Sequence, residues 1–293
     1  MSSTSVRKPA AKTHVSFFRS PLFRAFKNVF LGNGLVRRLM TSNFTCGRVA
    51  LGERNSYTFP MGWITVDWTD ADFPIWISED VKLPFADASQ DIVYSAHMME
   101  HLETPALRLL LREVARILKP GGALRIEVPD AELLMNALAS NDRAVLDYLR
   151  EGREDLIQSR DFMGPEYMED HVTVLGEIAN YIQRDIDIRH VPVYATRAEF
   201  DREAAKGLES FNDWAQSLKT PAQRKSGGHA NALTFDKMKA LLLEAGFRDV
   251  RRSHIGQTDI PGLKLGRGPA RIYDSIPEVP SRAVYSLYLE AFR

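Results

Sequence analysis

Residues 91–130 read DIVYSAHMMEHLETPALRLLLREVARILKPGGALRIEVPD and contain the alternation that decides the fold. The run Asp91–Ser95 is rich in β-branched and aromatic residues, which favours a strand. Apolar residues then recur at helical spacing over Leu107–Leu118, until the letters KPGG interrupt the pattern. A second strand-like run, Ala123–Val128, ends at a Pro-Asp pair. A strand, a helix and a strand in this order predict a crossover unit of a parallel sheet.

Shorter apolar runs precede this unit and are predicted to be further strands of the same sheet. They are Arg48–Leu51, Trp63–Val66 and Pro74–Ile77. Parallel sheets bind their ligands at the carboxyl ends of the strands. We therefore expect a site where these strands end, and the residues found there are Gly52, Asp67, Asp80, Ser95 to His101, and Pro129-Asp130.

Composition and charge narrow the class of protein. The 293 residues are 44% hydrophobic and 26% charged, with Cys46 as the single cysteine, which is typical of a globular protein and excludes a disulfide scaffold. Residues 1–52 contain nine Lys or Arg and no acid, whereas the rest carries a net charge of −9. An acidic body lacks the broad cationic face that nucleic-acid binding needs, so we expect no nucleic-acid partner.

Residues 1–45 form a basic arm. Phe18, Leu22, Phe26 and Phe30 recur every four residues with basic residues between them, which predicts an amphipathic helix within residues 17–40. Three interpretations stay open: packing on its own domain or on a dimer partner, peripheral contact with an anionic membrane, or an organelle transit peptide. The sequence does not determine the oligomeric state.

Three segments in order carry a family resemblance: GWITVDW (62–68), DVKLPFADASQDIVYSAHMMEHL (80–102) and LREVARILKPGGALRIEVPD (111–130). Together they resemble the class I S-adenosylmethionine-dependent methyltransferases, in particular type 11-like members predicted to act in surface-polysaccharide synthesis. The likeness resumes in LTFDKMKALLLEAGFRDVRRS (233–253) and SRAVYSLYLEAFR (281–293), which resemble the last helix and the last two strands of that fold. The resemblance implies an α/β fold, a doubly wound, mostly parallel seven-stranded sheet with an antiparallel last strand, and S-adenosylmethionine as cofactor.

We expect the methyltransferase-like domain to span residues 46–293, with a helical cap inserted at about 131–232. A helix is predicted over Leu133–Leu149, and another helical, charged stretch over Glu199–Leu218. Polar and aromatic residues of the insert are candidates for binding the acceptor: His171, Tyr181, His190, Tyr194 and His229.

The resemblance also implies roles for residues at the strand ends. Asp67, or alternatively Asp70, is expected to bind the ribose hydroxyls of the cofactor. Asp80 is expected to contact the adenine amino group, with Val81 packed on the ring. The residues expected to line the methionine end are Ser95, Ala96 and His97.

The first glycine loop departs from the family pattern, because Gly52 is followed by Glu53 and then by Arg54 in place of a second glycine. In one outcome Arg54 pairs with the methionine carboxylate of the cofactor while Glu53 meets its amino group. In the other, Arg54 obstructs the pocket. The domain is then a degenerate binding or scaffold protein.

The string His97-x-x-Glu100-His101 supplies the candidate catalytic residues, and His97 or His101 is a possible general base. The string also matches an inverted zinc-peptidase motif, but it follows a strand where that motif needs a central helix. We expect no metal ion. An alternative with a metal on Glu100 and His101, completed by His171, His190 or His229, stays open beside a purely structural role at the start of the next helix.

The expected activity is transfer of a methyl group from S-adenosylmethionine to an oxygen of a sugar or glycan precursor. We expect a cytoplasmic enzyme, in peripheral contact with the inner membrane face if the arm binds lipid. The alternative is the catalytically degenerate scaffold that obstruction by Arg54 would produce.

Overall fold

The computed structural model divides the chain into two units, residues 1–44 and 45–293, and only the second contains described residues. The structure describes residues 47–53, 63–68, 71–75, 77, 80–158, 165–179, 193–221, 224, 228–267, 276–278 and 280–293. Several predictions lie outside this range, namely those on the basic arm and on Cys46, Arg54, Asp70, Tyr181 and His190.

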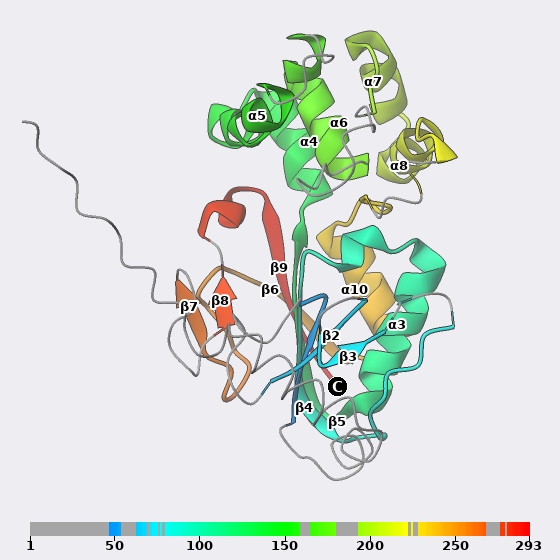
Figure 1. The fold of residues 1–293 in the computed structure, drawn as a ribbon, viewed down its shortest axis with the longest axis vertical. Helices are drawn as coiled ribbons and strands as arrows, with labels where there is room; N and C mark the ends of the chain where they lie inside the picture. The colour runs from blue at the N-terminus through cyan, green and yellow to red at the C-terminus, as the bar shows by residue number, and fades with distance from the viewer. Residues whose placement is uncertain are drawn as a thin grey trace, which may run out of the picture. The chain divides into compact units, whose positions relative to one another are not determined.

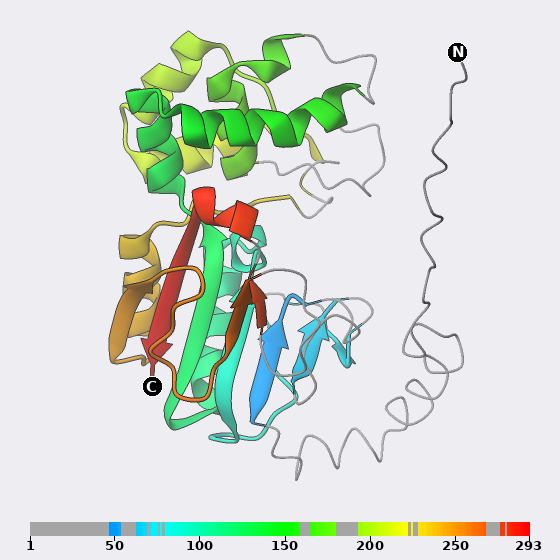
Figure 2. The same cartoon turned by 90° about the vertical axis from the view of Figure 1, so that its left-hand side faces the viewer.

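Among the described residues, seven strands form one sheet in the order β3-β2-β1-β4-β5-β9-β6 (Figures 1 and 2). The strands are β1 (Arg48–Leu51), β2 (Ile64–Asp67), β3 (Phe73–Pro74), β4 (Gln90–Ala96), β5 (Leu118–Pro129), β6 (Asp249–Ser253) and β9 (Ser286–Phe292). Strands β1 to β5 pair in parallel, whereas β9 is antiparallel to both β5 and β6. The predicted seven-stranded sheet with an antiparallel last strand is confirmed.

The KPGG run has a second role that the sequence did not predict. Helix α3 (Thr104–Ile117) ends just before it, as expected, but the run already belongs to β5. Pairing shifts from Gln90 opposite Leu118 to Ile92 opposite Ala123, so extra residues bulge from β5. The run therefore stops the helix and also offsets the register of the next strand.

Two different layers cover the faces of the sheet. Helices α3 and α10 (Phe235–Glu244) pack on one face around a core that includes Val49, Leu51, Val66, Leu107, Leu110, Met238 and Leu242. On the other face Ile260, Leu263 and Ile276 cover Ile92 and Tyr94. Ile276 belongs to a small parallel sheet of β7 (Leu265–Arg267) and β8 (Ile276–Glu278), which was not predicted (Figure 1).

The insert is helical and has a hydrophobic core of its own. Its helices include α4 (Ala131–Ser140), α5 (Arg143–Gln158), α6 (Asp170–Ala179), α7 (Arg197–Ala204) and α8 (Leu208–Ser217). They lie at the end of the sheet where β5 runs into α4 (Figure 2). No helix in the described part of the chain is long and apolar enough to cross a membrane.

Two helix predictions in the insert were wrong. The helix expected over Leu133–Leu149 is broken between α4 and α5, where Asn141 has a left-handed φ of 55°. The helical stretch expected within Glu199–Leu218 is broken between α7 and α8, where Gly207 has a φ of 95°. Asn141 is the left-handed residue that ends α4, whereas Gly207 is the N-cap from which α8 begins; asparagine and glycine adopt a positive φ at the lowest cost.

Candidate functional site

The carboxyl ends of four neighbouring strands form one row. Leu51 of β1 is paired with Val66 of β2 on one side and with Ser95 of β4 on the other. The next residue of β4 is paired with Glu127 of β5. Gly52, Asp67, Ser95 and Glu127 therefore lie at the same edge of the sheet, although they are far apart in the sequence.

Gly52 turns the chain tightly at the end of β1. Its N–H donates to the carbonyl oxygen of Val66 at 2.8 Å, and its φ is 78°. A Cβ at this position would lie 2.4 Å from the Cβ of Met98. Glycine is required here by both the positive φ and the close approach of the β4 turn.

The site is rich in buried acid. Burial raises the pKa of Glu53 to about 7; the carboxylates of Glu127 and Asp67 act in the same direction, against Arg282 and His97. The side chain of Asp67 is buried, and its Oδ1 accepts the N–H of Trp68. These carboxylates give the strand ends a negative character that favours a cationic ligand.

Ser95 contributes a buried hydroxyl. The residue is 1% exposed, and its Oγ has no hydrogen-bond partner among the residues that the structure describes. Buried hydroxyl groups are normally hydrogen-bonded, because a buried hydroxyl without a hydrogen bond costs roughly 1–3 kcal/mol. Ser95 therefore offers a polar atom that a ligand at the strand ends would satisfy.

His97 follows β4 in a left-handed conformation, with a φ of 48°. Its Nε2 lies 3.2 Å from Glu127 Oε1 and 3.1 Å from Ser286 Oγ, and its Nδ1 lies 3.3 Å from Glu100 Oε1. Burial disfavours the charged imidazole, but the pairing with Glu100 and Glu127 outweighs it and raises the pKa of His97 to about 9. His97 is thus charged at neutral pH, which argues against the predicted role as a general base.

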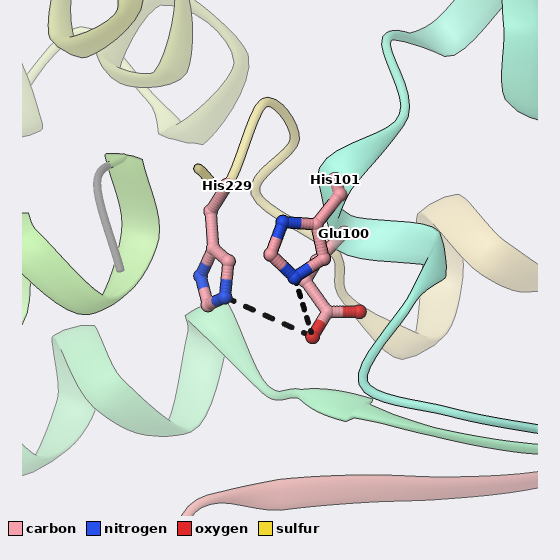
Figure 3. A group of neighbouring side chains, drawn as sticks. All are labelled: Glu100, His101 and His229. Carbon is pink, nitrogen blue, oxygen red and sulfur yellow. Dashed lines mark ion pairs between the residues drawn. The ribbon is translucent and has the colours of Figure 1, made fainter. Parts of the chain in front are cut away.

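Glu100 lies at the centre of three imidazoles. It belongs to the 3-10 turn Met99–His101, and is 1% exposed. Its Oε1 is 3.8 Å from His229 Nε2 and 4.0 Å from His101 Nε2 (Figure 3). Burial raises the pKa of Glu100, but the pairing with His97 and the positive character of the nearby imidazoles outweigh burial and lower this pKa to about 2.

His229 comes from the segment that returns from the helical insert to the sheet. Burial lowers its pKa to about 3, so the imidazole is neutral. Its Nδ1 is hydrogen-bonded to the carbonyl oxygen of Glu177 in α6. The next two residues, Ala230 and Asn231, donate their N–H groups to the carbonyl oxygen of Glu100 at 2.7 and 3.1 Å. The insert is thereby fixed to the turn that contains Glu100.

Other predicted residues lie elsewhere. Asp80 is exposed, Val81 belongs to the core, and both line a groove against α3 that none of the strand-end residues lines. His171 is buried in the insert, with its Nε2 3.0 Å from the carbonyl oxygen of Ala195. Tyr194 is 39% exposed and stacks at a tilt on Tyr167. Of the described acceptor-binding candidates, only His229 approaches Glu100.

The sequence reasoning missed Glu127 and the segment before β9. Besides contacting His97, Glu127 accepts from the hydroxyl of Tyr288 at 3.3 Å. A signal was present, because Arg125 and Glu127 alternate within an otherwise apolar strand and so point to the same face. Arg282 and Ser286 carried no such signal, since nothing in the local sequence places them at the strand ends.

Comparisons with known proteins agree with this geometry. Residues 59–126 match the model of a family described as a methyltransferase domain. No curated protein matches the sequence. The strand ends described above belong in part to this matched segment, which covers less than half of the chain. This similarity supports S-adenosylmethionine as the cofactor.

Solved structures also resemble the chain, at low similarity. A S-adenosylmethionine-dependent methyltransferase of Thermotoga maritima, described as a possible histamine N-methyltransferase, is 15% identical over 92% of this chain and 95% of that one, with a TM-score of 0.33. One from Aquifex aeolicus is 11% identical over 83% and 80%, with a TM-score of 0.34. One from Mesorhizobium loti is 14% identical over 90% and 100%, with a TM-score of 0.37.

The residues at the strand ends fit this cofactor. S-adenosylmethionine carries a positive sulfonium and a positive ammonium group, and half-buried Glu53 and buried Asp67 and Glu127 lie at the same edge of the sheet. The hydroxyl of Ser95 offers an unsatisfied polar atom, and Gly52 keeps the backbone of the loop close to the sheet. The prediction on Arg54 lies outside the described residues.

Proposed function

We propose that this protein transfers the methyl group of S-adenosylmethionine to a hydroxyl oxygen of a sugar or glycan precursor. The proposed binding of S-adenosylmethionine is supported by the row of strand ends at Gly52, Asp67 and Ser95, which has buried acidic residues beside it. The acceptor class is supported by the sequence resemblance described above.

The proposed roles follow from the chemistry of each side chain. Asp67 accepts hydrogen bonds from the ribose hydroxyls, and Glu53 binds the ammonium group. Ser95 and His97 lie at the methionine end. Asp80, exposed in the loop after β3, remains the proposed contact of the adenine amino group.

The protein's main task in this reaction is alignment. S-adenosylmethionine supplies an activated methyl group, so the site must hold acceptor oxygen, methyl carbon and sulfur in line while the carbon–sulfur bond breaks, the carbon–oxygen bond forms and the hydroxyl proton passes to water. His97 is charged at neutral pH and paired with Glu100 and Glu127, so we assign it a positioning role for these two carboxylates rather than the removal of a proton.

Calorimetry with S-adenosylhomocysteine tests the cofactor part. We expect the wild type to bind it and Asp67→Ala to bind at least about tenfold more weakly, because a charge-assisted pair of hydrogen bonds is lost. Asp213→Ala, an exposed position on α8, serves as the matched control and should leave binding unchanged. A folded wild type that does not bind the nucleoside would instead support the degenerate scaffold.

A panel of acceptors tests the substrate class. Release of S-adenosylhomocysteine is measured with sugar nucleotides and free glycans, beside hydroxyl and amine compounds of other classes. We expect turnover with the carbohydrates and a mass increase of one methyl on the sugar. Turnover confined to amines or to non-carbohydrate hydroxyls would contradict the proposed acceptor.

A further inference from the structure

We propose that Glu100, His101 and His229 form a binding site for a divalent first-row transition-metal ion. Each residue offers one ligand atom, and these atoms lie within 4.8 Å of one another (Figure 3). The glutamate and one histidine come from the turn after β4, and the other histidine from the segment after the insert.

The distances suit one shared ion. Both imidazole nitrogens approach the same carboxylate oxygen, Glu100 Oε1, at 3.8 Å from His229 and 4.0 Å from His101. Bonds of roughly 2.0–2.2 Å to zinc place two ligand atoms of one ion about 3–4 Å apart. Small side-chain rotations therefore suffice to close the site around an ion.

The carboxylate of Glu100 has room in its bonding for a metal ion beside His97. The residue is 1% exposed, and neither of its oxygens has a hydrogen-bond partner in the part of the chain that the structure describes. His97 lies within ion-pair distance on one side, at 3.3 Å. Burial of a carboxylate without hydrogen bonds is costly, and coordination of a metal ion removes that cost.

The orientation of His229 is that of a metal-binding histidine. A carbonyl oxygen can only accept, so the bond to Glu177 places a proton on Nδ1 and leaves Nε2 as the ring atom that can bind a metal ion. The lone pair is then on Nε2, the atom that faces Glu100 Oε1. Metal-binding imidazoles commonly donate their other ring N–H to a backbone carbonyl in this way.

The backbone around the cluster is held in place. Besides the two N–H groups that bind the carbonyl oxygen of Glu100, the side chain of Asn231 donates to Leu102 O at 3.2 Å and to Thr104 Oγ1 at 3.3 Å. The segment that contributes His229 is thus bound to the turn that contributes Glu100 and His101. Such supports orient ligands before the ion arrives.

The donor set indicates the kind of ion. Two imidazoles and one carboxylate suit zinc, iron, cobalt or manganese, whereas calcium and magnesium prefer oxygen donors alone. The site differs from the inverted zinc-peptidase motif, which needs His97 as a ligand. His97 instead lies between Glu100, Glu127 and Ser286.

Metal titration of the full-length protein tests the site. Chelator-treated protein is titrated with zinc and with cobalt chloride by calorimetry, and the cobalt complex is followed by its visible absorption. We expect one ion per chain and a cobalt spectrum of imidazole and carboxylate ligation. Glu100→Gln and His229→Gln should each weaken binding at least about tenfold, because each removes one ligand while keeping a similar side-chain volume.

Two control variants show whether the ion binds at this cluster. His254→Gln changes an exposed histidine and should bind metal as the wild type does. Asp67→Ala should also keep the metal, so that failure of cofactor binding and failure of metal binding are distinguishable. Circular dichroism confirms that each variant is folded. A wild type that binds neither ion, or binding that both ligand variants leave unchanged, would overturn the proposal.

Discussion

At the scale of single residues, burial and neighbouring charge have opposite effects on the pKa of two glutamates at this site. Glu53 and Glu100 are both acids beside a charged His97, yet burial dominates at Glu53 while the imidazoles dominate at Glu100. The outcome depends on distance, because charge interactions weaken with separation whereas the cost of burial is local. The same residue type therefore keeps its proton up to a much higher pH at one position than at the other.

Glu53 predicts a pH dependence of stability. Its pKa in the folded state is raised from 4.5 to about 7, so the folded state keeps a proton that the unfolded state loses. This residue's contribution is present below pH 4.5 and is lost as the pH rises towards 7. We expect Glu53→Gln to exceed the wild type in free energy of unfolding by about 1–2 kcal/mol at pH 8 and to equal it near pH 4.

Urea denaturation at the two pH values measures this difference. Glu151→Gln, an exposed glutamate of α5, is the matched control and should follow the wild type at both values. A Glu53→Gln variant with the same pH profile as the wild type would show that Glu53 titrates normally.

At the scale of secondary-structure elements, Arg125 connects β5 to strands β6, β8 and β9 through hydrogen bonds. Its guanidinium in β5 donates to Glu290 of β9 at 2.8 Å, to Glu278 of β8, and to Ser253 at the end of β6. Arg125 and both carboxylates are at most 1% exposed. This buried network links the main sheet to the small sheet of β7 and β8.

We expect Arg125→Met to lower the free energy of unfolding by about 3–5 kcal/mol, because it leaves two buried carboxylates without their partner. Arg251→Met on strand β6, which is separated from β5 by β9, is the matched control. Arg251 also pairs with two carboxylates, of Asp249 and Asp259, but its side chain is 51% exposed. Its loss should cost less than about 1 kcal/mol. Equal effects of the two variants in denaturant titrations would contradict a special role for the buried network.

At the scale of the whole described unit, the sheet and the helical insert have separate hydrophobic cores and meet at the carboxyl ends of the strands. Asp130 joins them: its Oδ1 accepts the N–H groups of Glu132 and Leu133 at the start of α4, and its Oδ2 lies 3.3 Å from Arg252 of β6. A ligand at the strand ends is therefore expected to stabilise the entire unit.

Thermal unfolding with S-adenosylhomocysteine measures this coupling. At a hundredfold excess over the dissociation constant, a ligand that binds only the folded state adds about 2.7 kcal/mol. For a domain of this size we expect the Tm to rise by roughly 5 °C. Asp67→Ala should show a much smaller shift at the same ligand concentration. An equal shift in both proteins would place the ligand away from Asp67.

Local patterns determined much of the fold in advance. The strand expected at Arg48–Leu51 has the predicted bounds, and the helix over Leu107–Leu118 differs only at its ends, because periodicity and helix stops are properties of neighbouring residues. The breaks at Asn141 and Gly207 were missed, since a single left-handed residue leaves the apolar spacing on either side intact.

The residues of the site likewise fall into those that the sequence predicted and those that only the tertiary structure revealed. Asp67, His97 and Glu100 were found from sequence because they follow strands, and parallel strands end at one edge of the sheet. His229, Glu127 and Ser286 lie on other segments, and only the packed chain brings them to His97 and Glu100. Sequence by itself thus determined which groups stand at the strand ends. Tertiary structure decided which histidine faces Glu100 and which groups are charged, because contact and burial arise between distant segments.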